Sequence, residues 1–144
     1  MSRAKHADIF AHLRTACAAI DATDGYNLTV AKVLDHPPLT TELDPLPLIA
    51  VVARDDQSRA LPCNLLAHTA VFELHGYVDA PFGSEAFDRA GLLLADMRRA
   101  VMIDPTCAGA AIDTFVQRSR SAPADDAGVV QVTLHLVVRY HEQV

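Results

Sequence analysis

The amino-acid sequence predicts an α+β fold, with one mainly antiparallel sheet and two principal helices packed on one of its faces. Two long stretches, residues 64–79 and 128–142, alternate apolar and polar side chains, which is typical of strands with one buried face. Two other stretches, residues 5–22 and 84–102, repeat apolar residues at helical spacing. Because the helices are few and the connections are of antiparallel type, the order of elements favours α+β over a parallel α/β sheet.

The first predicted element is the helix over residues 5–22, followed by Asp24-Gly25 and a short strand at about residues 27–34. Glycine is the usual residue just past a helix, where the backbone becomes left-handed, so Gly25 marks the end of this helix. The apolar stripe of the helix consists of Ile9, Leu13, Ala16, Cys17 and Ile20.

An extended, proline-rich arm is predicted at about residues 35–47, where DHPPLTTELDPLP contains four prolines. Proline lacks the N–H that a strand ladder needs and disfavours helix in the residue before it. Three leucines of the arm, Leu39, Leu43 and Leu46, would be poorly placed facing water. A partner surface is therefore expected to cover them.

A compact aliphatic run over residues 48–53 predicts a buried strand, and the polar residues 54–62 after it predict a loop. The long strand over residues 64–79 follows. The second helix runs to about Met102 with Ser84 as its N-cap and Glu85 and Arg89 as a helical ion pair. Its predicted buried stripe consists of Phe87, Ala90, Leu94, Met97 and Val101.

The chain closes with a strand over residues 112–120, a connection over residues 121–128 and the long strand over residues 128–142. A strand of about fifteen residues spans roughly 50 Å and needs a partner of similar length, in its own chain or in a neighbouring subunit. The predicted buried face of this last strand consists of Val130, Val132, Leu134, Leu136, Val138 and Tyr140.

With 144 residues, the chain is expected to form a single domain over residues 1–144. The formal net charge is −6, only two residues are lysines, and no basic cluster is large, so a DNA-clamping role finds no support. No apolar run is long enough to span a bilayer, and no membrane association is expected. Cys17, Cys63 and Cys107 are interpreted as reduced structural thiols.

The sequence contains no pattern that predicts catalysis or metal binding. Seven histidines include none at the HxH, HxxxH or HExxH spacings of zinc sites. His68 is interpreted as a satisfied core histidine, and His75 could lie opposite His135 if the two long strands pair. The paired carboxylates Asp55-Asp56 and Asp125-Asp126 are interpreted as solvated charge. We therefore expect that the protein is not an enzyme and that it has no catalytic residues, no cofactor and no metal.

The order of elements resembles a known family. The helix HADIFAHLRTACAAI leads to a strand, the proline-rich arm and LPLIAVVA; then come AVFELHGYVDA, the helix EAFDRAGLLLADMRRAVM and a closing strand ending VVQVTLHLVVRYHE. Over nearly the whole chain this pattern resembles the tail terminator or tail completion proteins of long-tailed bacteriophages, typified by the lambda minor tail protein U. The resemblance rests on pattern and order, because the family offers no tight residue signature.

The resemblance implies a virion protein, assembled in the host cytoplasm, whose copies form a ring, expected to be a hexamer. That ring would bind the end of the tail tube protein, stop its polymerisation and offer a docking surface to a neck or head–tail connector protein. DNA would pass through the lumen without specific binding, which suits an acidic protein.

Candidate contact residues follow from the unexplained surface features, not from the family. Contacts between subunits are expected on the edges of the long strands and on the arm, at Pro37, Pro38, Leu39, Leu43 and Leu46. Contacts with tube or neck are expected on residues 54–62 and 121–127, at Arg54, Asp55, Asp56, Arg59, Asp125 and Asp126.

Two other interpretations stay open. The chain could be another head–tail joining or neck protein of the same particle. It could also belong to a different class, a standalone α+β module that binds a small ligand, which would be a monomer with a defined pocket. An enzyme is the least favoured interpretation.

Overall fold

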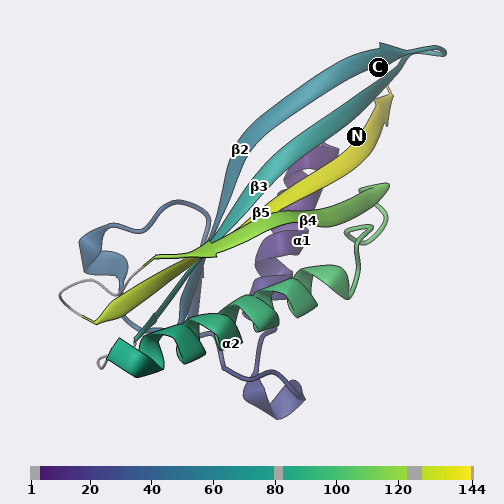
Figure 1. The fold of residues 1–144 in the computed structure, drawn as a ribbon. Helices are drawn as coiled ribbons and strands as arrows, with labels where there is room; N and C mark the ends of the chain where they lie inside the picture. Colours follow the sequence, from purple (N-terminus) through teal and green to yellow (C-terminus); the bar gives the residue numbers. More distant parts are fainter. Residues whose placement is uncertain (1–3, 80–82, 123–127, 144) are drawn as a thin grey trace.

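The computed structural model describes residues 4–79, 83–122 and 128–143 and has the expected α+β fold (Figure 1). A five-stranded sheet of order β1-β2-β3-β5-β4 carries two helices on one face. The elements are α1 (Lys5–Ala18), β1 (Lys32–Leu34), β2 (Leu48–Leu61), β3 (Leu65–Asp79), α2 (Gly83–Met102), β4 (Asp113–Ser121) and β5 (Val129–Gln143), with 3-10 turns at Ala22–Asp24 and Thr40–Glu42.

The two long strands predicted from alternation pair with each other. β3 and β5 are antiparallel along their whole lengths, from Leu65 opposite Gln143 to Asp79 opposite Val129. β2 flanks β3 and β4 flanks β5, both antiparallel, whereas the short β1 pairs in parallel with the start of β2. The partner strand that each long strand needs is therefore supplied within the chain.

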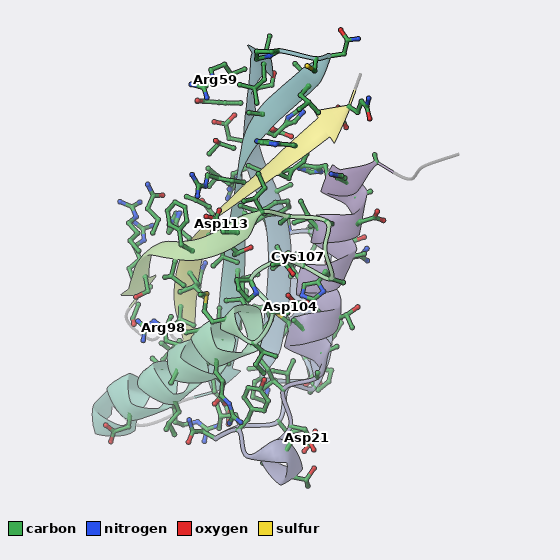
Figure 2. All side chains as sticks on the ribbon, turned by 90° about the vertical axis from the view of Figure 1, so that its right-hand side faces the viewer. Asp21, Arg59, Arg98, Asp104, Cys107 and Asp113 are labelled. Atoms are coloured by element: carbon green, nitrogen blue, oxygen red, sulfur yellow. The ribbon has the colours of Figure 1, made fainter. Side chains whose placement is uncertain are left out.

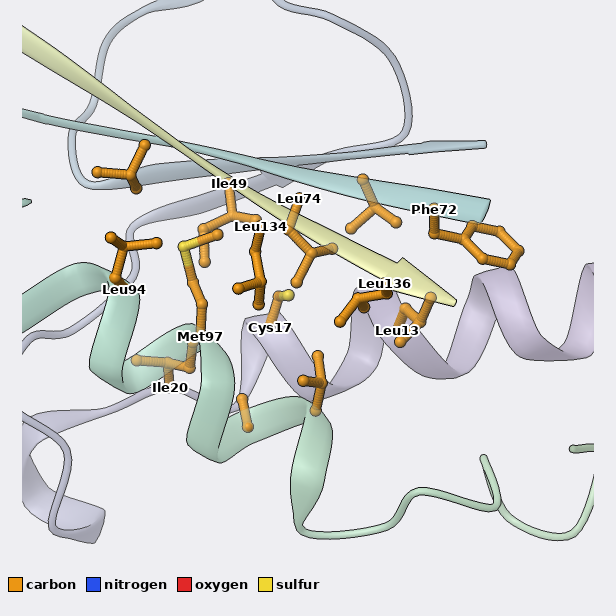
Figure 3. Packing of buried hydrophobic residues seen from close by; sticks show 14 of the residues in the cluster. Leu13, Cys17, Ile20, Ile49, Phe72, Leu74, Leu94, Met97, Leu134 and Leu136 are labelled. Atoms are coloured by element: carbon orange, nitrogen blue, oxygen red, sulfur yellow. The ribbon is translucent and has the colours of Figure 1, made fainter. Parts of the chain in front are cut away.

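The core lies between the sheet and the two helices (Figure 3). The predicted face of β5 is buried along its whole length. The predicted stripes of both helices are buried as well, apart from the half-buried Ala16; the side chain of Phe87 lies outside the described part of the structure. Burial raises the pKa of the Cys17 thiol to about 12, so this cysteine behaves as an apolar core residue, as expected. The largest fully buried side chains include Leu13, Ile20, Phe72, Leu74, Met97, Leu134 and Leu136.

One buried carboxylate joins α2 to the segment that follows the first helix. Asp96 is buried, and its oxygens accept hydrogen bonds from the backbone N–H groups of Asn27 and Leu28 and from the side-chain amide of Asn27, at 2.8–3.0 Å. Sequence reasoning missed this contact. The available signal was an acidic residue within the apolar stripe of an amphipathic helix.

The region after α1 differs from the prediction. The helix ends at Ala18, and Asp21 caps a 3-10 turn by accepting a hydrogen bond from the Thr23 N–H at 2.9 Å. The strand predicted at residues 27–34 is confined to Lys32–Leu34, because Asn27 and Leu28 hydrogen-bond to Asp96 and not to a strand. Local side-chain hydrogen bonds at Asp and Asn thus replace regular structure here.

The prediction of a polar loop at residues 54–62 is wrong. Except for Pro62 these residues belong to β2, which continues to Leu61 and pairs with β3 as far as Leu65. Residues 53–60 are all exposed, so neither face of this part of the strand needs apolar residues, and no alternation reveals it. The register shifts between Ala53 and Asp55, where a bulge accommodates one extra residue.

Two expectations about α2 concern its first turn. The helix already begins at Gly83, one residue before the predicted cap Ser84, and the side chains of residues 83–87 lie outside the described part of the structure. The guanidinium of Arg89 bonds to Asp79, through the backbone carbonyl and the carboxylate. α2 is therefore tied to the end of β3. No described helix is both long and apolar enough to cross a bilayer.

Candidate assembly surface

The most prominent surface feature is a hairpin formed by the second half of β2, the turn at residues 62–64 and the first part of β3. It extends beyond both helices, accompanied by the end of β5 (Figure 1). Cys63 and Asn64 in the turn have positive φ angles of 65° and 59°. Cys63 is exposed there, so the expectation of a structural thiol fails for this cysteine.

Four predicted contact residues lie on this hairpin: Arg54, Asp55, Asp56 and Arg59. All four are exposed. Figure 2 shows Arg59 towards the far end of the hairpin, at the opposite end of the molecule from Asp21. The structure thus places these residues together on one projection, although on a strand and not on the expected loop.

On the helix side of the hairpin, a polar cluster surrounds Tyr140. Its hydroxyl donates to Asp56 Oδ2 at 2.5 Å, and its ring stacks on His68 with the centroids 4.5 Å apart. His68 Nδ1 lies 3.0 Å from Asp56 Oδ1, and Nε2 lies 3.5 Å from Glu142. Burial and the hydrogen bond to Asp56 both raise the pKa of Tyr140. His68 shares the face of Phe72 as predicted, but it belongs to this cluster at the edge of the core.

The outer face, which is the sheet face away from α1 and α2, carries a second polar cluster around Glu73. Arg54 Nε and His75 Nε2 lie 3.0 and 2.8 Å from Glu73 Oε2, and His135 Nδ1 lies 3.6 Å from Oε1. Burial opposes the charge on Glu73, but the hydrogen bonds from Arg54 and His75 outweigh it and lower the pKa. Burial lowers the pKa of His135, and the nearby arginines Arg118 and Arg120 lower it further.

This register corrects one expectation. His75 lies opposite Thr133, and His135 lies opposite Glu73, so the two histidines are not directly paired. Among the described residues, no group of three or more His, Cys, Asp or Glu side chains is arranged to hold a metal ion.

The arm over residues 35–47 covers the start of β2 on the outer face (Figure 1). Leu48, Ala50 and Val52 point away from the helices, yet all three are buried. Lys32 Nζ donates to the Glu42 carbonyl, which ties the middle of the arm to β1, and the Ala31 N–H donates to the Pro47 carbonyl, which ties the end of the arm to the residue before β1. The arm is therefore partly packed on its own sheet.

The predicted contact residues of the arm have different environments. Pro37 and Leu39 are exposed, and Leu39 is 67% exposed. Pro38, Leu43 and Leu46 are half-buried, so the expectation that all three leucines lack a contact within their own chain is too strong. Leu39 remains the apolar arm residue that faces solvent most fully.

A histidine bridges two carboxylates of the arm. His36 Nδ1 lies 2.8 Å from Asp35, and Nε2 lies 3.0 Å from Glu42, whose carboxylate also accepts the Leu39 N–H at 3.0 Å. The hydrogen bonds to Asp35 and Glu42 raise the pKa of His36. The arm thereby holds a defined acidic surface.

The opposite edge of the sheet is formed by β4, which exposes apolar and basic side chains. Ile112 and Phe115 are 49% and 44% exposed, and Arg118 and Arg120 are exposed beside them. Arg98 from α2 reaches this edge by donating to Ser119 Oγ at 2.7 Å. Sequence reasoning did not single out this edge. Asp125 and Asp126, predicted in the connection that follows β4, lie outside the described residues.

A surface hollow lies on the outer face of the hairpin. It has a volume of about 420 Å³, and its lining includes Arg59, Arg139 and His141. Arg139 is held by the Asp113 carboxylate, with Nε 2.8 Å from Oδ1. The hollow lies over strands, and Arg59 is the arginine of its lining that has no carboxylate partner among the described residues.

A comparison with protein-family models finds no match, and a comparison with curated proteins finds none either. Among solved structures, the fold is similar to a chain of a structure described as "Virion of native gene transfer agent (GTA) particle". The TM-score is 0.51 at 15% sequence identity, and the alignment covers 92% of this chain and 92% of that chain. This likeness shows a shared fold over nearly the whole length.

Proposed function

We propose that this chain is a structural subunit of a phage-like particle, and that its copies form a ring that closes the end of the tail tube. The observation that carries the proposal is the hairpin, whose β2 residues 53–60 are exposed on both faces. Two findings support it: the order of elements resembles tail terminator proteins, and the fold is shared with a chain of a gene transfer agent virion.

The hairpin favours assembly for a physical reason. A two-stranded ribbon is marginal in water because it buries little apolar surface, and here only the end of β5 extends the ribbon to three strands. The unpaired outer side of β2 offers backbone N–H and C=O groups to another chain. A neighbouring subunit or a tube end can satisfy those groups and bury the ribbon.

Termination then follows from occupancy. A ring that binds the last tube ring on one face, and presents a different surface on the other, leaves no site for a further tube ring. Closing the ring joins many weak contacts, and avidity of this kind can exceed a single contact by about 10² to 10⁴. The role needs no active site, and DNA would pass through the lumen without specific binding.

The test is the assembly state of the purified protein, measured by native mass spectrometry and negative-stain imaging, with and without tube protein. For the protein alone we expect closed rings of six copies. With tube protein present, we expect these rings to sit on tube ends, and the capped tubes to stop growing. A protein that stays monomeric at every concentration, also with tube protein present, would contradict the proposal and favour the small-ligand module.

A second experiment separates a terminator from another head–tail joining or neck protein. Removing this chain from the assembling particle should give overlong tubes if it stops polymerisation. Tubes of normal length beside unjoined heads would instead assign the chain to the neck.

A further inference from the structure

The sheet has two outer edges with unpaired backbone groups in the described part of the chain. β1 pairs only with residues 48–50 of β2, so residues 52–61 form one open edge, the β2 edge. The outer side of β4, over residues 113–121, forms the other, the β4 edge. The two edges are about equally long, and open edges are the natural sites for adding a strand from another chain.

The strand directions match at these two edges. Neighbours from β2 to β4 are all antiparallel in the order β2-β3-β5-β4, so β4 runs opposite to β2. If a second copy continues the sheet in the same orientation, its β4 lies beside the β2 of the first copy and runs antiparallel to it. Such a contact joins two different edges, and head-to-tail contacts of this kind generate rings when the rotation closes.

The charges beside the two edges are complementary and lie on the same face of the sheet. Arg118 and Arg120 are opposite His135 and Thr133 on the outer face of β4. The acidic arm covers the outer face over the start of β2, at one end of the β2 edge, and Asp55 belongs to that edge. The acidic residues are Asp35, Glu42 and Asp44 on the arm and Asp55 on β2, whereas the neighbouring Arg54 is paired with Glu73.

Exposed apolar side chains follow the same division. Of the six large apolar residues that are exposed in the described chain, four are close together in sequence at the end of α2 and the start of β4: Met102, Ile103, Ile112 and Phe115. Leu39 lies on the arm, at the other edge. A head-to-tail contact would cover Phe115, which lies level with Asp55 of β2.

We infer that the partner of each edge is a second copy of this chain, with the β4 edge of one subunit adding antiparallel to the β2 edge of the next. Arg118 and Arg120, at the end of β4 that lies level with the start of β2, then face the acidic arm. This inference rests on the proposed ring and specifies how the ring closes. Within one subunit, β4 lies level with residues 49–57 of β2 across the sheet. Because β1 already pairs with residues 48–50 of β2, the added β4 is shifted along β2 towards the hairpin tip, where it does not overlap β1.

Charge reversal on each edge tests the inference. Variant A carries Arg118→Glu and Arg120→Glu, and variant B carries Asp44→Lys and Asp55→Lys. These four side chains are exposed, so both variants should keep the melting temperature of the wild type. Like charges across an interface are strongly unfavourable, so each variant alone should lower the fraction of rings by about tenfold or more.

An equimolar mixture of A and B distinguishes this arrangement from others. In the mixture, the glutamates introduced in A face the lysines introduced in B, while the native arginines of B face the native aspartates of A. Both contacts are therefore complementary, and rings of alternating copies should return. A control that changes the charge as much as variant B does, but away from both edges, is Asp24→Lys with Asp88→Lys, and it should form rings without a partner variant.

The outcomes separate the two proposals. If the wild type forms no rings, the proposed function fails. If the wild type forms rings and either A or B does so equally well alone, or the mixture does not recover, the edge pairing is wrong while the ring stands. Hydrogen exchange on the wild type provides a measurement without variants: the amides of residues 52–61 and 113–121 should become protected when rings form, and unchanged exchange there would overturn the pairing.

Discussion

Gly76 shows at residue scale how closely the second helix approaches the sheet. A Cβ at this position would lie 2.7 Å from Leu93 Cδ2, 2.9 Å from Met97 Sδ and 2.9 Å from Val132 Cγ2. These distances are shorter than side chains tolerate, so the lack of a side chain at residue 76 lets α2 pack directly on β3 and β5. Leu93 and Met97 of α2 thus occupy the space that a methyl group at residue 76 would need.

We expect Gly76→Ala to lower the free energy of unfolding by about 1–3 kcal/mol, because the added methyl overpacks the core. Gly91→Ala is the matched control. Gly91 is exposed within α2, and nothing lies within 4 Å of its added Cβ, so alanine should raise the stability by about 0.5–1 kcal/mol. Urea unfolding of both variants measures the difference, and equal effects would show that α2 does not press on residue 76.

Asp96 provides the second residue-scale prediction. Asp96→Ala leaves the N–H groups of Asn27 and Leu28 without their carboxylate acceptor, so we expect a loss of about 2–4 kcal/mol. Asp88→Ala, on the exposed side of the same helix, should change stability by less than about 0.5 kcal/mol. Chemical unfolding measures both. Equal losses would mean that water replaces the carboxylate at little cost.

At the scale of elements, the hairpin contrasts with the rest of the sheet. On the helix side, β3 is buried from Ala70 to Val78 and β5 from Val130 to Tyr140, whereas β2 is buried only over its first five residues. The last part of the hairpin contributes ladder hydrogen bonds but little buried apolar surface. Stability and assembly should therefore depend on different parts of the same strands.

Shortening the hairpin tests this separation. Ser58 and His68 are already paired across the hairpin. Replacing residues 59–67 with Asn-Gly therefore connects them by a favoured two-residue turn. All nine removed residues are exposed or half-buried, so the melting temperature should change by only a few degrees. Assembly into rings or onto tubes should be lost.

The control for this truncation keeps the full strands and replaces only the turn at residues 62–64 with Asn-Gly. This variant should assemble like the wild type. Sedimentation and calorimetry measure both properties. If the short hairpin unfolds the subunit, the ribbon belongs to the core; if the short variant still assembles, the hairpin does not mediate contacts.

At the scale of the whole molecule, the charge of −6 is unevenly distributed. Arg118 and Arg120 lie on β4, whereas Asp35, Glu42 and Asp44 lie on the arm beside the start of β2. An acidic protein with a basic edge suits association with copies of itself, since each copy carries both signs at opposite ends of one sheet. The net charge alone gave no indication of this arrangement.

The sequence by itself determined the elements whose side chains are divided between core and solvent. The alternation from Val130 to Tyr140 and the stripe from Ala90 to Val101 correctly predicted which faces are buried. These patterns are reliable because a slip of one residue would expose a whole apolar face. The proline-rich composition likewise predicted the arm, since proline excludes both ladder and helix.

Only the tertiary structure decided what depends on partners distant in sequence. Residues 54–59 are polar on both faces, and the stretch as far as Leu61 carries no periodic signal, so its pairing with β3 makes it a strand. The register of β3 with β5 likewise placed Glu73, and not His75, opposite His135. Periodicity records which side of an element is buried, whereas pairing and register arise from backbone hydrogen bonds that every residue except proline can make.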